Sequence, residues 1–279
     1  MSKFETIINE IVESCPPGEI ESIYSDLLKI TGSDNETRIL DSIKVHNVKT
    51  ISTISIPSLG NKKFIISEHN VDDSKFVDYN NHIRFSVDHL KFEGIDVEED
   101  VEGLELNDDQ MKIFNDLEKY VKVGFPNDDA TIGVFPDKNE SSSSFSSSKI
   151  HIIIVSEVFN PNNYWNGSWK SQYVYDTNNK KLSGDITVQI HYFEDGNVNF
   201  TSKKDIDNVS LNDNENVVDD VIKKLETDFE KELDVSFTNL NEKQFKSLRR
   251  RLPITRSKVN WGKAIGNYRL GRDAANGLQ

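Results

Sequence analysis

The chain has 279 residues, of which 35% are hydrophobic, and a formal net charge of −14. Its 15 Phe, 8 Tyr and 3 Trp exclude a disordered chain and predict a hydrophobic core. One cysteine, Cys15, excludes an internal disulfide framework and fits a reducing compartment, and no apolar run approaches the ~18 residues that span a bilayer. The N-terminus resembles neither a secretory signal nor a transit peptide, so we expect a cytosolic protein.

Residues 1–46 are predicted to form short helices. Apolar residues recur at helical spacing in 4–12, and Pro16-Pro17-Gly18 ends this first helix. A second helix is expected over 20–28 and a third over 35–43. Because the connections are short, we expect an antiparallel three-helix bundle.

From about His46 the hydrophobic pattern changes to a period of two, which is typical of strands. We predict strands over 48–56, 63–68 and 83–92 within a strand- and turn-rich middle region, 47–106. Residues 93–109 are acidic and weakly patterned, so they are interpreted as a surface connection.

The third region, 107–252, begins with a predicted helix whose N-cap is Asn107 and which ends before Gly124. Asp108 and Asp109 lie in its first turn and are better explained by the helix dipole than by catalysis. The serine-rich stretch 139–149 is interpreted as a flexible loop between strands.

Four strands with alternating apolar and polar residues are expected next, as an antiparallel meander. Their predicted ranges are 149–159, 164–175, 183–194 and 197–202. Asp195-Gly196 is a typical hairpin turn between the last two strands.

An apolar stripe at helical spacing then runs from Val217 to Leu248. It requires about 35 residues of helix, roughly 50 Å long, which Pro253 ends. A helix of this length is expected to cover the sheet. The predicted fold class is therefore α+β: helical bundle, strand-rich middle region, antiparallel sheet with a long C-terminal helix, and a mobile amphipathic tail, 253–279.

Positive charge is concentrated at the C-terminal end, although the whole chain is acidic. No acidic residue occurs between Lys243 and Arg272. The ten basic residues there are Lys243, Lys246, Arg249, Arg250, Arg251, Arg256, Lys258, Lys263, Arg269 and Arg272. Such a segment can be a solvated helix face, or it can bind nucleic acid, an anionic membrane, calmodulin or an acidic protein surface. The acidity of the remaining chain argues against free nucleic acid.

The stretch after Pro253 combines this charge with apolar residues. Trp261, Ile265 and Tyr268 could share one face of a short helix that Gly262 and Gly266 weaken. Because about a dozen residues are too few for a stable isolated helix, we expect this tail to become ordered on a partner.

Enzymatic chemistry is poorly supported by the sequence. It contains no P-loop, GxGxxG, HExxH or CxxC motif, so we expect no enzyme activity, cofactor or metal. His191 with Glu194 and Asp195 could be offered as acid–base groups. A strand histidine followed by a hairpin turn is the preferred interpretation.

Two stretches carry a specific resemblance to a known family. IHYFEDGNV (190–198) and FKSLRRRLPITR (245–256) resemble the two signature patterns of the F-actin capping protein alpha subunit. PPGE at 16–19, WNGSWKS at 165–171 and the closing VNWGKAIGNYRLG occur in the expected order. The chain departs from the family in the serine-rich insertion and in Gly262 and Gly266.

The resemblance implies a non-enzymatic subunit that joins its sheet to that of a homologous capping protein beta subunit. The heterodimer would bind barbed ends of actin filaments, independently of calcium, and block subunit addition and loss. Its expected location is the cytoplasm, in the cytoskeleton of the actin-rich cortex. Motif position assigns basic contacts to Lys246, Arg250 and Arg256. The full set of expected actin-binding residues is Lys246, Arg249, Arg250, Arg256, Lys258, Trp261, Ile265, Tyr268 and Leu270.

Anionic phosphoinositide lipids are a further expected partner, because Trp261 and Tyr268 suit a membrane interface. The alternative function is an adaptor, regulated by anionic lipid, that docks through its basic tail. Nucleic acid is not an expected partner.

Overall fold

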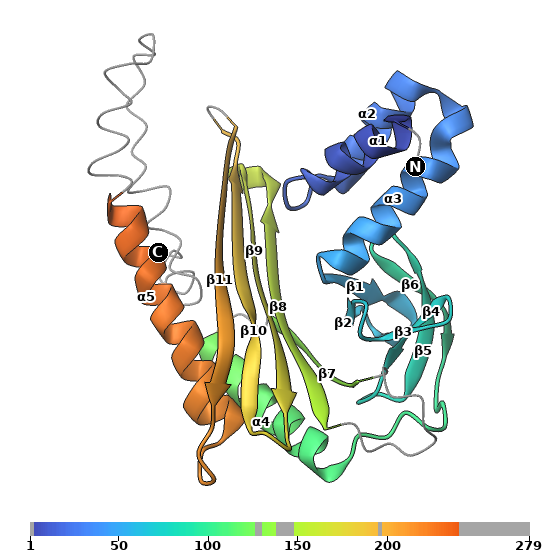
Figure 1. Cartoon of the computed structure of the whole chain (residues 1–279). Helices are drawn as coiled ribbons and strands as arrows, with labels where there is room; N and C mark the ends of the chain where they lie inside the picture. Colours follow the sequence, from blue (N-terminus) through green and yellow to red (C-terminus); the bar gives the residue numbers. More distant parts are fainter. Residues whose placement is uncertain (1–2, 126–129, 138–147, 195–196, 240–279) are drawn as a thin grey trace. The chain divides into compact units, whose positions relative to one another are not determined.

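A computed structural model describes residues 3–125, 130–137, 148–194 and 197–239 (Figure 1). The chain divides into two compact units. The first comprises Met1–Asn115 and Ala130–Asn212, and the second comprises Asp116–Asp129 and Asp213–Gln279. The first unit contains the N-terminal helices and two sheets, so the predicted mixed α+β architecture is confirmed.

Three helices form the N-terminal part of the first unit, as predicted. They are α1 (Lys3–Glu13), α2 (Ile20–Thr31) and α3 (Glu36–Lys49), with a 3₁₀ turn, η1 (Ser33–Asn35), before α3. They enclose one core, whose buried members are Ile8, Val12, Cys15, Ile20, Leu27, Ile39 and Ile43. The antiparallel order of the helices stays a prediction.

The boundary between α3 and the first strand differs from the prediction. Residues 48–50 were expected to begin a strand, but the helix extends to Lys49. The main-chain N–H and the hydroxyl of Thr50 each donate to the His46 carbonyl, at 2.8 Å, and so cap the last turn. Ile51 then turns the chain in the left-handed region, with φ of 52°. Helix capping therefore overrides the alternating pattern at this point.

The first sheet has six strands in the order β2-β1-β6-β5-β4-β3 (Figure 1). Their bounds are β1 Ser52–Ile56, β2 Lys62–Ile66, β3 Val71–Asp72, β4 Lys75–Asp78, β5 Ile83–Asp88 and β6 Glu93–Glu98. β1 pairs in parallel with β6, and the other pairs are antiparallel. A 3₁₀ turn, η2 (Pro57–Leu59), connects β1 to β2.

The interpretation of 93–109 as a surface connection is wrong for its first six residues, which form β6. The inward-facing position there is Gly94. A Cβ at this position would lie 2.6 Å from Cγ1 of Ile56, so the neighbouring strand fills the space that a side chain would occupy. The predicted strand over 83–92 also ends early, because the Asp88 carboxylate accepts from the N–H groups of Leu90 and Lys91 in a turn.

The second sheet is an antiparallel meander in the order β11-β10-β9-β8-β7. Its strands are β7 Ala130–Pro136, β8 Lys149–Asn160, β9 Trp165–Asp176, β10 Lys181–Tyr192 and β11 Val198–Ser210. A 3₁₀ turn, η3 (Pro161–Asn163), precedes β9. The four predicted strands are confirmed, although β11 is longer than expected and β7 was not predicted. The turn at Asp195-Gly196 and residues 139–147 of the serine-rich stretch lie outside the described residues.

A second core joins the two sheets along β7 and β2. Its members are Ile51, Ile65, Val77, Tyr79, Leu104, Phe135, Ile153 and Val155. Phe135 of β7 contacts Tyr79 with ring centroids 6.3 Å apart. β2 thus packs beside β7, whereas β11 forms the opposite edge of the meander.

Helix α4 (Asp108–Gly124) crosses the boundary between the units. Its predicted N-cap is confirmed: the Gln110 N–H donates to Asn107 Oδ1, and the Asn107 N–H donates to Gln110 Oε1, both at 2.9 Å. The helix includes Gly124 instead of ending before it.

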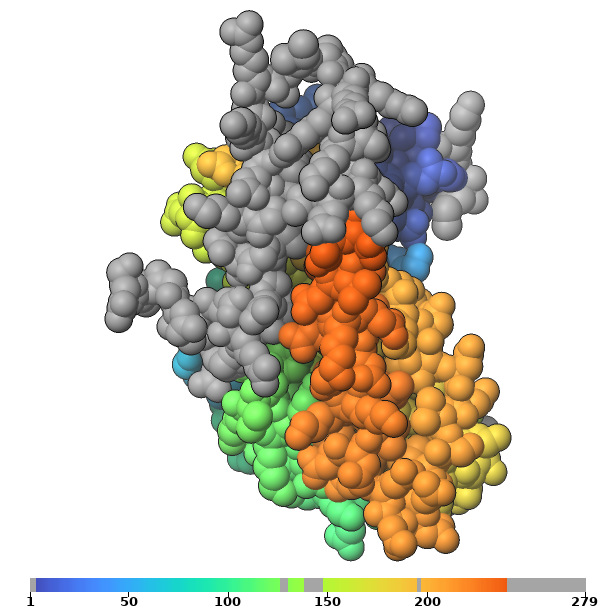
Figure 2. Space-filling view, turned by 90° about the vertical axis from the view of Figure 1, so that its left-hand side faces the viewer, coloured from blue at the N-terminus to red at the C-terminus, as the bar shows by residue number. Residues whose placement is uncertain are grey.

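The second unit contains the end of α4, a π-helical turn η4 (Val217–Ile222) and α5 (Lys223–Asn239). Figure 2 shows α5 beside the end of α4, where the Tyr120 hydroxyl donates to Glu226 Oε2 at 2.6 Å. Of the predicted long helix, the stretch from Val217 to Asn239 is confirmed as continuous. Residues 240–252 lie outside the described residues, and the position of the helix over the sheet stays a prediction.

Candidate functional site

The expected actin-binding residues all follow Asn239 and lie outside the described residues. They are Lys246, Arg249, Arg250, Arg256, Lys258, Trp261, Ile265, Tyr268 and Leu270. Their roles therefore stay predictions. The described residues contain two other features suited to binding: an open strand edge on β11 and a cavity in the first unit.

The outer edge of β11 is available for pairing, since no described strand lies beyond it. Exposure alternates along the strand, and its exposed positions include Asn199, Thr201, Lys203 and Asp205. Lys203 Nζ lies 3.2 Å from Asp205 Oδ1 and 3.7 Å from Asp185 Oδ2. Edge strands with unpaired N–H and C=O groups can receive a strand from another chain, and charged side chains discourage unspecific pairing.

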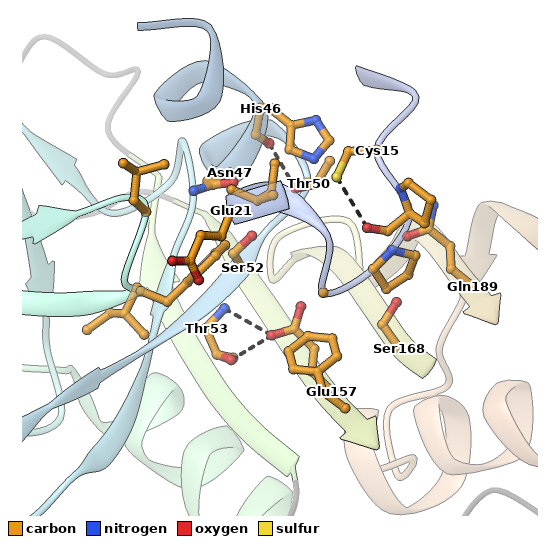
Figure 3. Close-up of a pocket in the computed structure, with 18 of the residues that line it drawn as sticks. Cys15, Glu21, His46, Asn47, Thr50, Ser52, Thr53, Glu157, Ser168 and Gln189 are labelled. Atoms are coloured by element: carbon orange, nitrogen blue, oxygen red, sulfur yellow. Dashed lines mark hydrogen bonds between the residues drawn. The ribbon is translucent and has the colours of Figure 1, made fainter. Parts of the chain in front are cut away.

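The cavity has a volume of about 460 Å³ and lies among the loop after α1, the end of α3, and strands β1, β8 and β9 (Figure 3). The loop Pro16-Pro17-Gly18 forms one wall. Asn166 Nδ2 on β9 donates to the Pro17 carbonyl at 2.9 Å. Gly18 has φ of +82°, and a Cβ there would lie 2.7 Å from Asn166 Nδ2. Glycine is thus required for this wall to reach the sheet.

A largely buried ion pair forms the floor of the cavity: Glu157 Oε1 on β8 lies 2.9 Å from Lys170 Nζ on β9. Glu157 Oε2 accepts from the Thr53 hydroxyl at 2.6 Å (Figure 3). Lys170 also donates to the Thr50 carbonyl at 2.9 Å. Burial opposes ionisation of Glu157, but Lys170 and Thr53 outweigh it and lower the pKa of this carboxyl below its usual value.

Cys15 and His46, which line the cavity, are not poised for nucleophilic or acid–base chemistry near pH 7. Burial, with the nearby Glu19, raises the pKa of the Cys15 thiol to about 12. Burial, with the nearby Lys170, lowers the pKa of His46 to about 4. The thiol is therefore protonated and the imidazole neutral at physiological pH.

His191 is also placed as a strand residue. It is buried, and its Nε2 lies 3.0 Å from Asn197 Oδ1. Glu194, offered as its partner, instead accepts from the Tyr192 hydroxyl, and Asp195 lies outside the described residues. This geometry supports the strand interpretation.

The described part of the chain shows neither a cluster of metal ligands nor a helix suited to cross a membrane. No group of three or more His, Cys, Asp or Glu side chains there could hold a metal ion. None of the helices in the same ranges is both long and apolar enough to cross a membrane.

Comparisons with known proteins cover almost the whole chain. The family model of the F-actin capping protein alpha subunit matches residues 8–273. The F-actin-capping protein subunit alpha of Candida glabrata is 50% identical over 276 residues, 98% of both chains. That of Saccharomyces cerevisiae is 47% identical over 281 residues, 99% of this chain and 98% of the relative.

A solved structure shares the fold. The homodimeric actin capping protein alpha subunit from Plasmodium berghei matches with a TM-score of 0.68 and 22% sequence identity, over 91% of this chain and 98% of that one. The family model extends through both signature stretches and the basic tail, so the resemblance is not confined to the described residues. The chain belongs to the F-actin capping protein alpha subunit family.

Proposed function

We propose that the chain is the alpha subunit of a heterodimeric, non-enzymatic capping protein that binds barbed ends of actin filaments and blocks subunit addition and loss. The observation that carries the proposal is the family match over residues 8–273, which includes the stretch FKSLRRRLPITR. Binding is proposed to be independent of calcium, as the resemblance to the capping protein alpha family implies.

The basic tail is proposed to act in two parts. Lys246, Arg250 and Arg256 lie in the stretch with ten positive and no negative charges, and they would steer the complex towards an acidic filament end. Apolar residues further along would then slow dissociation by contact with the same surface. The members of this second part are Trp261, Ile265, Tyr268 and Leu270.

A capping protein beta subunit is the proposed partner, and β11 is its proposed docking strand. The two edges of the meander differ: β7 packs beside β2, whereas β11 has a neighbour on one side among the described strands. A continuous sheet would form if the partner added a strand along the thirteen residues of β11.

Proline substitution in the middle of β11 tests this docking strand. Adjacent residues of an edge strand direct their N–H groups to opposite sides, so Thr201→Pro and Ser202→Pro remove one N–H each, one facing β10 and the other facing outward. We expect the variant that loses the outward-facing N–H to keep the unfolding midpoint of the chain and to lose co-purification with the beta subunit. The variant that loses the N–H facing β10 should have a lower unfolding midpoint. If the variant with the unchanged midpoint still co-purifies stoichiometrically, β11 is not the docking strand.

Anionic phosphoinositides are proposed to bind the same tail and compete with filament ends, which would place regulation at the actin-rich cell cortex. Basic clusters interleaved with aromatic residues bind anionic lipid surfaces. Liposome co-sedimentation at physiological salt should show binding that filament ends reduce. Lipid binding by a complex that never caps would instead favour the adaptor function.

Seeded actin elongation tests the proposed function. Nanomolar complex, purified from co-expression of both subunits, should stop growth from seeds with free barbed ends, equally with calcium or with a chelator present. Growth from seeds whose barbed ends are already blocked should be unaffected. Unchanged elongation from free barbed ends at saturating complex contradicts the proposal.

A further inference from the structure

Two histidines stack on each other where the first sheet meets the meander. His69 lies in the turn between β2 and β3, and His151 lies on β8. Their ring centroids are 4.0 Å apart, and the rings are inclined by 17°. We propose that this stacked pair is an acid-sensitive contact, and that protons which bind to it loosen the junction between the two sheets. The contact is separate from the basic tail and from β11.

The stacked pair lies at the end of the core that joins the two sheets. His151, Ile153 and Val155 are alternate residues of β8, so their side chains lie on one face of the strand, and the last two belong to that core. On the first sheet, His69 follows the core residue Ile65 of β2. The side chains of His69 and His151 are only 21% and 12% exposed. Separation of the rings would therefore open this end of the core to water.

The main chain holds each ring firmly in place. In the turn that carries His69, Asn70 Oδ1 accepts from the Ser67 N–H at 2.8 Å, and Asn70 Nδ2 donates to the Ile65 carbonyl at 2.9 Å. On the other side, His151 is paired with both neighbouring strands, β7 and β9. Because both backbones are fixed and both rings are largely buried, repulsion between the rings is relieved most readily by separation of the two elements.

Two carboxylates and one lysine are the charged groups that act on the pair among the described residues. His69 Nε2 lies 3.9 Å from Glu68 Oε1. His151 Nε2 lies 3.8 Å from Oδ1 of Asp137, which follows the end of β7. Lys149, two residues before His151, opposes its protonation. A carboxylate can balance a first proton, but a second proton would place two like charges in stacked rings.

The sign of the pH effect follows from the folded and opened states. Burial lowers the pKa of His69, and burial together with His69 lowers the pKa of His151 to about 4. In an opened state both groups return towards the ordinary value of 6.5. Between these values the opened state binds more protons, so the contact is fully stabilising above pH 6.5 and weakens as pH falls towards 4. For His151 alone, opening becomes about tenfold more favourable between pH 7.5 and pH 5.5.

Hydrogen exchange of the main-chain amides in β2 and β7 tests the proposal in the complex purified from co-expression of both subunits. After correction for the intrinsic pH dependence of exchange, protection of these amides should be about tenfold lower at pH 5.5 than at pH 7.5. Amides in the middle of β10 should keep their protection. The double variant His69→Phe with His151→Phe retains two aromatic rings that bind no proton, so its β2 and β7 amides should be protected equally at both pH values.

His89→Phe is the matched control. Burial, with the nearby Lys44, also lowers the pKa of His89 to about 4, but this ring contacts Phe76 instead of another histidine. The control should reduce the pH dependence of global urea unfolding and still lose protection in β2 and β7 at pH 5.5. If the double variant does not fold, His151→Gln takes its place and should lose less protection than the wild type. Equal protection of β2 and β7 at both pH values in the wild type would overturn the proposal, as would a variant of the pair that loses as much protection as the wild type.

Discussion

Lys170→Met is expected to lower the free energy of unfolding by about 3–5 kcal/mol, because it leaves the Glu157 carboxylate buried without its counter-charge. The two side chains are 15% and 10% exposed, and their charged atoms lie 2.9 Å apart. Methionine fills a similar volume, so packing is largely retained and the electrostatic cost dominates. Equilibrium urea unfolding of the complex at pH 7 measures the loss.

The destabilisation caused by Lys170→Met should decrease at low pH. In the folded wild type the pKa of Glu157 lies below its ordinary value of 4.5. The pair therefore contributes its full stability above that value, and the contribution is lost as pH falls through the lower, folded pKa. In Lys170→Met only burial and the Thr53 contacts remain, so the folded pKa rises. The difference between the two proteins should shrink as pH falls towards 4.

A double-mutant cycle provides the control. Glu157→Gln alone leaves Lys170 buried and unpaired, so it should also destabilise the chain. The double variant with Lys170→Met carries no buried charge and should lose less stability than the sum of the single variants. Strict additivity would mean that the ion pair does not link β8 to β9 energetically.

Replacing Lys246, Arg250 and Arg256 together by alanine is expected to slow association with barbed ends about ten- to a hundredfold at low salt. Positive charges raise encounter rates with an acidic surface by such factors, and salt screens the effect. The initial rate of growth inhibition, followed at two salt concentrations, measures the change. Heterodimer yield should stay the same.

A matched control separates the loss of net positive charge from the loss of these three tail residues. It replaces three exposed lysines elsewhere by alanine: Lys29, Lys119 and Lys231. This control changes the net charge equally and should associate at nearly the wild-type rate. If association slows equally in both variants, the overall charge steers the complex, and Lys246, Arg250 and Arg256 do not form a specific steering site.

Strong local patterns allowed much of the fold to be predicted from the sequence. Alternation identified β8 to β11, and helical spacing with the Asn107 cap identified α4. Local patterns failed where a contact from elsewhere decided the structure. β6 was missed because its inward position is Gly94, whose space is filled by Ile56. β7, ATIGVFP, gave no alternation to detect, because consecutive residues in it are buried.

The cavity could not have been found from the sequence. Its floor joins Thr53 to Glu157, which are 104 positions apart, and its wall depends on Asn166 meeting Pro17 across 149 positions. Each of these residues is unremarkable in its own local pattern. The basic tail, in contrast, could be recognised from the sequence, because its positive charges lie within one continuous stretch.

Imaging of single growing filaments with a fluorescently labelled complex tests whether the complex caps barbed ends. Labelled complex should bind the fast-growing end of each filament, and growth there should stop at the moment of binding while the slow-growing end continues. The triple tail variant should arrive later at the same ends. Continued growth of the fast end with complex bound, or binding along filament sides without arrest, would rule out barbed-end capping by this complex.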